Sequence, residues 1–407
     1  TITCHIQGNT GTISAPAMLV TGTAFGNNGS CTMNFGSGCE WYLTGAEGGA
    51  FDGYSFILQE GKVTNTVNAG GSTWNIYRAW YNDNVFNAGT STVNFVGSST
   101  IMGSGTQSFN DVSISGTLTA YSGNMNIAGD FTNIGTFIHN SGTVTFNGTG
   151  TSNITGATTF NYLTCTTSGK TLAFGTTSTQ TIGTFIVTGV SGNLVNIQST
   201  SSGAQGTINA TNSSVSYAAV KDSYNAGSTI TPTYSTNLGN NNTPAGWDFG
   251  SSTIVWDGSN SSAWSTAANW NIGAVPSVYD NISIPDASTT EHGLVLETSP
   301  TINDITIDAD GVVDGADQTL TVTGNWVNNG SFVCSTGTVA FAGTTTISGS
   351  NATTFNNVNI EGVMTGHAVK MNVIGDWMVG AGGTFYHNSG TILFKAVDLA
   401  DDTRSIQ

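Results

Sequence analysis

Apolar residues recur along this chain at a fixed spacing of 51 residues. Nine positions begin the pattern: Trp74, Ile76, Trp80, Phe86, Val93, Phe95, Phe109, Val112 and Ile114. The residues 51 places later are also apolar: Met125, Ile127, Phe131, Phe137, Val144, Phe146, Phe160, Leu163 and Cys165. A third copy keeps the same internal spacing: Leu320, Val322, Trp326, Phe332, Val339, Phe341, Phe355, Val358 and Ile360. A fourth copy starts 51 residues after the third and contains a two-residue insertion: Met371, Val373, Trp377, Phe385, Ile392 and Phe394. Such self-similarity is typical of repeat proteins, whose units bury their apolar faces by stacking.

Within each unit, apolar and polar residues alternate over short runs such as Thr143 to Phe146. Alternation places successive side chains on opposite faces, so it predicts short strands with one buried side. Asn-Gly, Ser-Gly and Thr-Gly pairs between the runs supply the positive φ angles of sharp corners. We expect each unit to form two coils of about 25 residues, with parallel strands about 4.8 Å apart. The predicted fold is an all-β, right-handed parallel β-helix or β-solenoid built from 51-residue repeats. Tandem β-sandwich domains are the alternative.

The repeat pattern divides the chain into four parts. Residues 1–73 do not match the unit and are expected to form an N-terminal β cap. Residues 74–250 form the first predicted solenoid module, and residues 251–319 form a Trp-rich opening of the second. Residues 320–407 complete the second module and end in the middle of a repeat.

The Trp-rich opening carries a resemblance to a known class of proteins. Its residues are Trp256-Asp257-Gly258, Trp264, Asn269-Trp270, Gly273, Pro276, Asp280 and Ile282-Ser283-Ile284. This pattern resembles the module-opening motif of secreted bacterial and archaeal surface proteins, including adhesin-like and autotransporter-passenger-like regions. The Gly-, Thr- and Asn-rich repeats are similar to the β-solenoid repeats of these proteins. The resemblance implies an extracellular, cell-surface location and an elongated shape, and it carries no catalytic motif.

Net charge and the lengths of the apolar runs exclude two classes of interaction, with nucleic acid and through a membrane span. The net charge is −17, from 24 acidic and 7 basic residues, and no Lys or Arg lies between Lys221 and Lys370. Nucleic acid would be repelled by this charge. No apolar run approaches the length of a membrane span, so we expect no membrane-spanning segment. Because the sequence begins at Thr1, we expect a mature secreted protein from which a targeting segment has been removed.

The cysteines suggest one bridge and one core residue. Cys31 and Cys39 flank a short Gly-rich loop and are candidates for a disulfide in a secreted protein. Cys165 occupies a repeat position that is Ile in two other copies, so we expect a small buried apolar residue there.

Four carboxylates form the best candidate metal site: Asp308, Asp310, Asp314 and Asp317. Clustered oxygen ligands without nearby basic residues are typical of calcium sites. A solvated corner of the solenoid is the alternative, and calcium is the only cofactor considered. His139, His387 and Cys334 share one repeat position, but such a ladder supplies too few ligands for zinc.

No catalytic constellation is found, so we expect a protein that is not an enzyme. The only arginines, Arg78 and Arg404, lie at opposite ends of the chain, and Asp401 and Asp402 would point to opposite faces of a strand. The predicted function is that of a structural subunit of a cell-surface filament, sheath or similar extracellular assembly. The alternative is an adhesin or fibre that binds glycans through exposed aromatics such as Tyr121, Tyr162 or Tyr386. A tailspike-like polysaccharide depolymerase is a third class.

The two ends of the sequence suggest how subunits would associate. The last repeat reaches Ile392 and Phe394, and after Ile406 no counterpart of Leu163 and Cys165 remains. The first residues alternate like that missing strand, with Ile2, Cys4 and Ile6 on one side. We therefore expect self-association into a head-to-tail homopolymer, in which the N-terminal strand of one subunit completes the last coil of the next.

Overall fold

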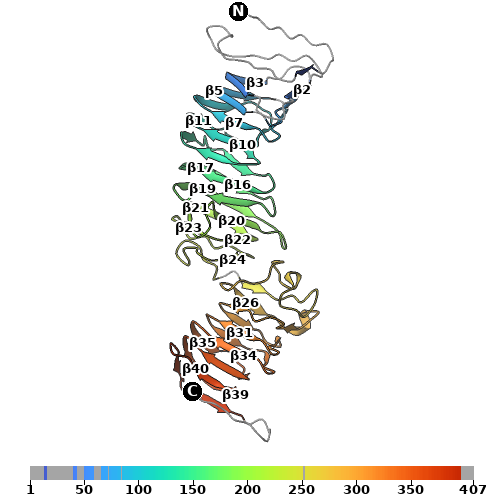
Figure 1. Cartoon of the computed structure of the whole chain (residues 1–407), viewed down its shortest axis with the longest axis vertical. Helices are drawn as coiled ribbons and strands as arrows, with labels where there is room; N and C mark the ends of the chain where they lie inside the picture. The colour runs from blue at the N-terminus through green and yellow to red at the C-terminus, as the bar shows by residue number, and fades with distance from the viewer. Residues whose placement is uncertain are drawn as a thin grey trace, which may run out of the picture.

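The computed structural model describes residues 69–395, apart from residues 72, 84, 251 and 252, and the backbone of four earlier strands. The strands stack as a β-solenoid of about 17 turns with about 2% helix (Figure 1). The ladders between strands are parallel, as in the pairs β7 with β10, β17 with β19 and β31 with β34. This confirms the β-solenoid, because the alternative of tandem β-sandwiches requires antiparallel sheets.

The strands of the first module lie on three faces, and the second face has separate strands only in the early coils. The first face contains β5 (Thr73–Asn82), β7 (Thr92–Phe95), β10 (Asp111–Ile114), β13 (Phe131–Asn133), β16 (Thr151–Thr155), β18 (Thr171–Phe174), β20 (Val195–Ser199), β22 (Ala218–Val220) and β24 (Thr236–Asn237). The second continues from the end of β5 through β8 (Ser98–Met102), β11 (Thr117–Thr119) and β14 (Thr136–Ile138). The third contains β9 (Gln107–Phe109), β12 (Asn124–Ile127), β15 (Thr143–Phe146), β17 (Thr158–Cys165), β19 (Thr179–Thr188), β21 (Gly206–Ser216) and β23 (Ser223–Asn225).

Parallel pairing also extends before residue 74. In the expected cap region, β3 (Ala50–Leu58) pairs with β5. Three further strands form a sheet with β6 (Val85–Asn87): β1 (Ile13–Ala15), β2 (Glu40–Leu43) and β4 (Thr66–Asn68). The described backbone of this region therefore continues the pairing pattern of the solenoid.

The second module repeats the three-faced plan. One face contains β25 (Thr253–Val255), β26 (Asn281–Ile284), β29 (Ile305–Ile307), β32 (Trp326–Asn328), β35 (Thr344–Ser348), β38 (Val363–Thr365) and β41 (Thr384–Tyr386). Another contains β28 (Thr301–Ile302), β31 (Thr319–Val322), β34 (Thr338–Phe341), β37 (Asn357–Ile360) and β40 (Trp377–Val379). The remaining strands are β27 (Leu294–Val295), β30 (Val312–Asp314), β33 (Ser331–Val333), β36 (Thr353–Phe355), β39 (Lys370–Val373) and β42 (Thr391–Phe394). Two short 3-10 helices are η1 (Ala267–Asn269) and η2 (Ala287–Thr289).

The expected coil length of about 25 residues is wrong. Val93 pairs with Val112, and Val112 pairs with Phe131, so one coil takes 19 residues here. The equivalent repeat positions Leu320 and Met371 lie in β31 and β39, eight strands apart. With three strands per coil, a 51-residue unit therefore spans two and two-thirds coils. Equivalent residues in successive copies lie on different faces, and the buried ones point into the interior of their own module.

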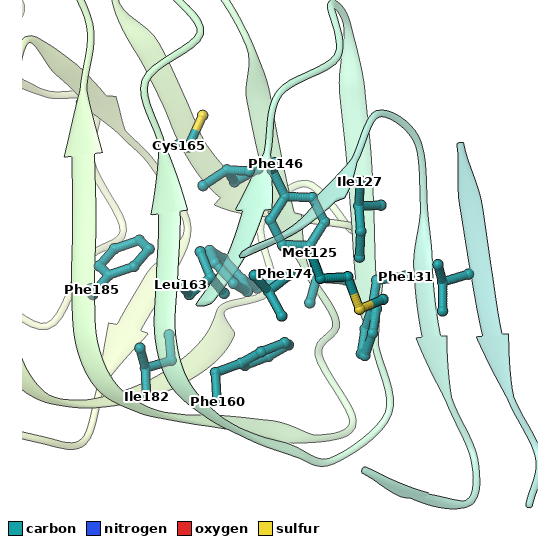
Figure 2. Close-up of a cluster of buried hydrophobic side chains, with 14 of the residues drawn as sticks. Met125, Ile127, Phe131, Phe146, Phe160, Leu163, Cys165, Phe174, Ile182 and Phe185 are labelled. Carbon is teal, nitrogen blue, oxygen red and sulfur yellow. The ribbon is translucent and has the colours of Figure 1, made fainter. Parts of the chain in front are cut away.

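The repeated apolar positions form the core. In the first three copies all nine positions are buried, and in the fourth Met371, Val373 and Trp377 are buried. Figure 2 shows side chains of successive coils, including Phe131 and Phe160, meeting in the interior of the first module. These two rings lie 5.4 Å apart between centroids. Burial of alternate strand residues thus produces one apolar interior along each module.

The buried residues form two separate clusters. One extends over residues 69–249 and the other over residues 254–377. No helix among the described residues is long and apolar enough to cross a membrane.

Candidate functional site

The four aspartates of the candidate calcium site do not converge. The Asp308 carboxylate accepts a hydrogen bond from Ser283 Oγ at 2.8 Å, across to the preceding coil. Asp314 Oδ1 accepts from Ala316 N and Ser335 Oγ, at 2.9 and 3.2 Å. Asp317 accepts from its neighbour Gln318. Asp310 lies at a corner with a φ of 61°. In the part of the chain that the structure describes, no three His, Cys, Asp or Glu side chains gather as a metal site.

The recurring His-Asn-Ser-Gly sequence forms the same solenoid corner twice. His139 Nδ1 accepts a hydrogen bond from Ser141 N at 3.0 Å, and His387 Nδ1 accepts from Ser389 N at the same distance. Asn140 follows His139 in the left-handed region, and its amide donates to the preceding coil at Ala120 O, 3.1 Å away. Both histidines therefore shape a turn.

Cys165 is a free, buried cysteine, as its repeat position predicted. Burial raises the pKa of its thiol. The candidate bridge residues Cys31 and Cys39 lie outside the described residues.

Lys170 is a buried cation that the sequence reasoning missed. Its Nζ donates to Ala128 O at 3.1 Å, although the two residues are 42 positions apart. The side chain therefore joins coils that are not adjacent in the stack. Burial lowers the pKa of Lys170, while the charges of Cys165 and Asp130 oppose this change. Its position before β18, in a corner that repeat comparison does not cover, gave no signal of burial.

Replacing Lys170 by Met should change how stability depends on pH. Because the pKa is lower in the folded state, the unfolded chain binds more protons between that pKa and the ordinary value of 10.5. The free energy of unfolding should therefore rise with pH across this range in the wild type. Urea titrations from neutral pH to about pH 10 should show a smaller rise in Lys170→Met. The exposed Lys221→Met is the matched control, and equal pH slopes in all three proteins would contradict the prediction.

The tryptophans of the module-opening motif belong to the second core. The Trp270 ring lies 5.1 Å from Trp256 and 4.8 Å from Trp264, edge to face in both cases. The Glu297 carboxylate accepts hydrogen bonds from the backbone of Trp264 and Ser265, at 2.8 and 2.7 Å. These contacts fix the loop that carries the cluster, so the motif organises the start of the second module.

A buried Asn recurs in three repeat units, which the search for apolar positions did not detect. These residues are Asn82, Asn133 and Asn328. The side-chain amide of Asn133 donates to Thr158 Oγ1 at 3.1 Å, and that of Asn328 donates to Thr353 Oγ1 at 3.0 Å. Each bond joins two coils inside the core. The signal was present in the sequence as an Asn two residues after Trp80, Phe131 and Trp326, which share one repeat position.

The three tyrosines proposed for glycan stacking lie apart. Tyr121 packs against the first core and is only partly exposed. Tyr162 lies on β17 and Tyr386 on β41, with 40% and 58% of their surface exposed. These tyrosines therefore lie in two different modules and do not form one platform.

Two other tyrosines do stack on each other. The rings of Tyr217 and Tyr234 lie 5.1 Å apart between centroids, with 14° between their planes. Their φ angles are 50° and 49°, a left-handed conformation that is rare for bulky residues. Tyr234 is 50% exposed. Strained residues of this kind often mark functional sites, and no periodic signal identified this pair.

Of the residues expected to support assembly, two are described. Ile392 packs against the second core, and Phe394 is 37% exposed with its ring 6.1 Å from Trp377. Ile2, Cys4, Ile6 and Ile406 lie outside the described residues.

Comparison with known proteins gave no match to a protein-family model, a curated protein or a solved structure.

Proposed function

We propose that this chain is a non-enzymatic structural protein of an extracellular, cell-surface assembly, in which the solenoid serves as a stiff, elongated element. The observation that carries the proposal is the pair of apolar cores that extend through the stacked coils. A solenoid of about 17 turns at about 4.8 Å per coil extends over roughly 80 Å. Most of the repeated residues therefore serve to build a long and stiff rod. The extracellular location rests on the resemblance of the Trp256 to Ile284 motif to surface proteins.

Self-association is part of this proposal and is tested by sedimentation. The full chain should form larger species as its concentration rises, and electron micrographs should show rods joined end to end. Phe394→Asp should weaken this association, because it would place a charge at a partly exposed apolar side chain of β42. Tyr162→Asp, an exposed residue on the side of the rod, is the control. A chain that stays monomeric at every concentration would contradict the structural role.

Glycan binding is the second candidate function, and the stacked pair Tyr217 and Tyr234 favours it. Aromatic faces pack against the apolar face of sugar rings, and the half-exposed Tyr234 offers such a surface. A net charge of −17 favours neutral glycans over acidic ones. Saturable binding on a glycan array, lost in Tyr234→Ala and kept in Tyr162→Ala, would support this function. Cleavage of the bound glycan would instead indicate the depolymerase class.

A further inference from the structure

The two modules touch at a joint between β24 and β25. The axis of the solenoid changes direction between β24 and β26 (Figure 1). A covalent link alone would leave the two modules free to rotate against each other. Two sets of contacts between residues distant in sequence bridge this joint.

The first contact is a buried carboxylate. Asp280, in the loop before β26, is buried against the last coil of the first module. Its carboxylate accepts hydrogen bonds from Thr236 Oγ1 at 2.6 Å and from Asn237 N at 3.0 Å, both in β24. Within its own loop it accepts from Ser277 N at 2.7 Å, and Ser277 Oγ donates to Asn237 O at 2.6 Å. One carboxylate thus holds three donors, two of which belong to the other module.

The second contact lies at a different place on the joint. Gly192, in the loop between β19 and β20, donates its N–H to Ile272 O at 2.8 Å. Gly273 has a φ of 64°, and a Cβ on it would overlap the backbone of Gly192. The two backbones therefore approach as closely as only glycine permits.

We infer that the joint is a fixed elbow rather than a hinge, and that the Asp280 carboxylate is the latch that holds it. Separation of the modules would break the bonds from Thr236 and Asn237 to the buried Asp280 carboxylate. Donors and acceptors that are left buried without a partner are costly. The Gly192 contact adds a second point of attachment, so with the covalent link the two modules are held together at three places. The direction of the second rod is therefore built into the fold.

Hydrogen exchange of the full chain tests the latch. In Asp280→Ala, the Gly192 amide should exchange about tenfold faster or more, because the modules would separate more often. The Gly192 N–H donates to Ile272 O and not to the Asp280 carboxylate, so its exchange reports separation and not the lost acceptor. Core amides such as those of Val144 and Val339 should keep their protection. Small-angle scattering of the variant should require a range of bend angles, whereas one angle should fit the wild type.

The exposed Asp376→Ala is the matched control and should leave Gly192 exchange unchanged. If Asp280→Ala does not fold, Thr236→Val and Ser277→Ala remove single bonds of the latch and should each give a smaller increase. Unchanged Gly192 exchange in every folded latch variant would overturn the inference. A range of bend angles in the wild type would overturn it as well.

Discussion

Trp326→Ala is expected to lower the free energy of unfolding of the second module by about 3 to 5 kcal/mol, the range for loss of a large buried aromatic. The Trp326 ring packs against Phe332, Phe341 and Phe355, with centroids 5.0, 6.3 and 5.3 Å away. Its indole N–H donates to Thr353 Oγ1 at 3.2 Å. Truncation would leave a cavity between coils that are fixed by their backbone ladders, so the site can collapse only partly.

Urea unfolding followed by tryptophan fluorescence and by hydrogen exchange would measure this loss. Because coils of a solenoid contact mainly their neighbours, the lost protection should be greatest in β29, β32 and β35. Phe332→Ala and Phe137→Ala should show losses in the same range of about 3 to 5 kcal/mol. The exposed Tyr386→Ala is the control and should cost little. A loss below about 1 kcal/mol at Trp326 would mean that the inward and outward faces are misassigned.

The second large effect is expected from Gly156→Ala, compared with Gly203→Ala in the same module. Both glycines have left-handed backbones, with φ of 80° and 82°. A Cβ on Gly156 would overlap Asn133 O, whereas a Cβ on Gly203 would meet nothing within 4 Å. Gly203→Ala should therefore cost only the backbone strain, about 1 to 2 kcal/mol. Gly156→Ala should cost about 1 to 3 kcal/mol more, because the coils must move apart to relieve the overlap.

The difference in unfolding free energy between the two variants measures the cost of the steric overlap between coils, separately from the cost of the left-handed backbone. Thermal unfolding at fixed protein concentration, with both variants and the wild type, is a sufficient measurement. Equal losses in the two variants would show that backbone strain alone determines the cost. The equivalent glycine of the third repeat is Gly349, where a Cβ would overlap Asn328 O, so the same substitution there should also be costly.

The latch and the stacked tyrosines show why the candidate sites were not predictable. Asp280 was recognised as part of a motif, but its partners Thr236 and Asn237 lie 44 and 43 residues earlier, outside the repeated units. Likewise, Asp308 to Asp317 are close in sequence, but successive strands and corners turn their carboxylates toward different partners. Proximity in sequence is a poor guide to ligand geometry in a solenoid, where residues meet across coils.

The sequence by itself predicted short strands, burial of alternate residues and a solenoid of two modules, and it left tandem β-sandwiches as the alternative that the parallel ladders exclude. These properties follow from local alternation and from the 51-residue recurrence, since most positions that recur on the inward side are apolar. Only the tertiary structure showed that a coil within the repeat units takes 19 residues. The 51-residue period gives the spacing of equivalent strands, but it does not reveal how many strands make one turn of the solenoid. The tertiary structure also decided the burial of Lys170 and Asp280 and the pairing of Tyr217 with Tyr234. Those contacts form between coils or modules, where the stacking geometry brings residues together that no local pattern relates.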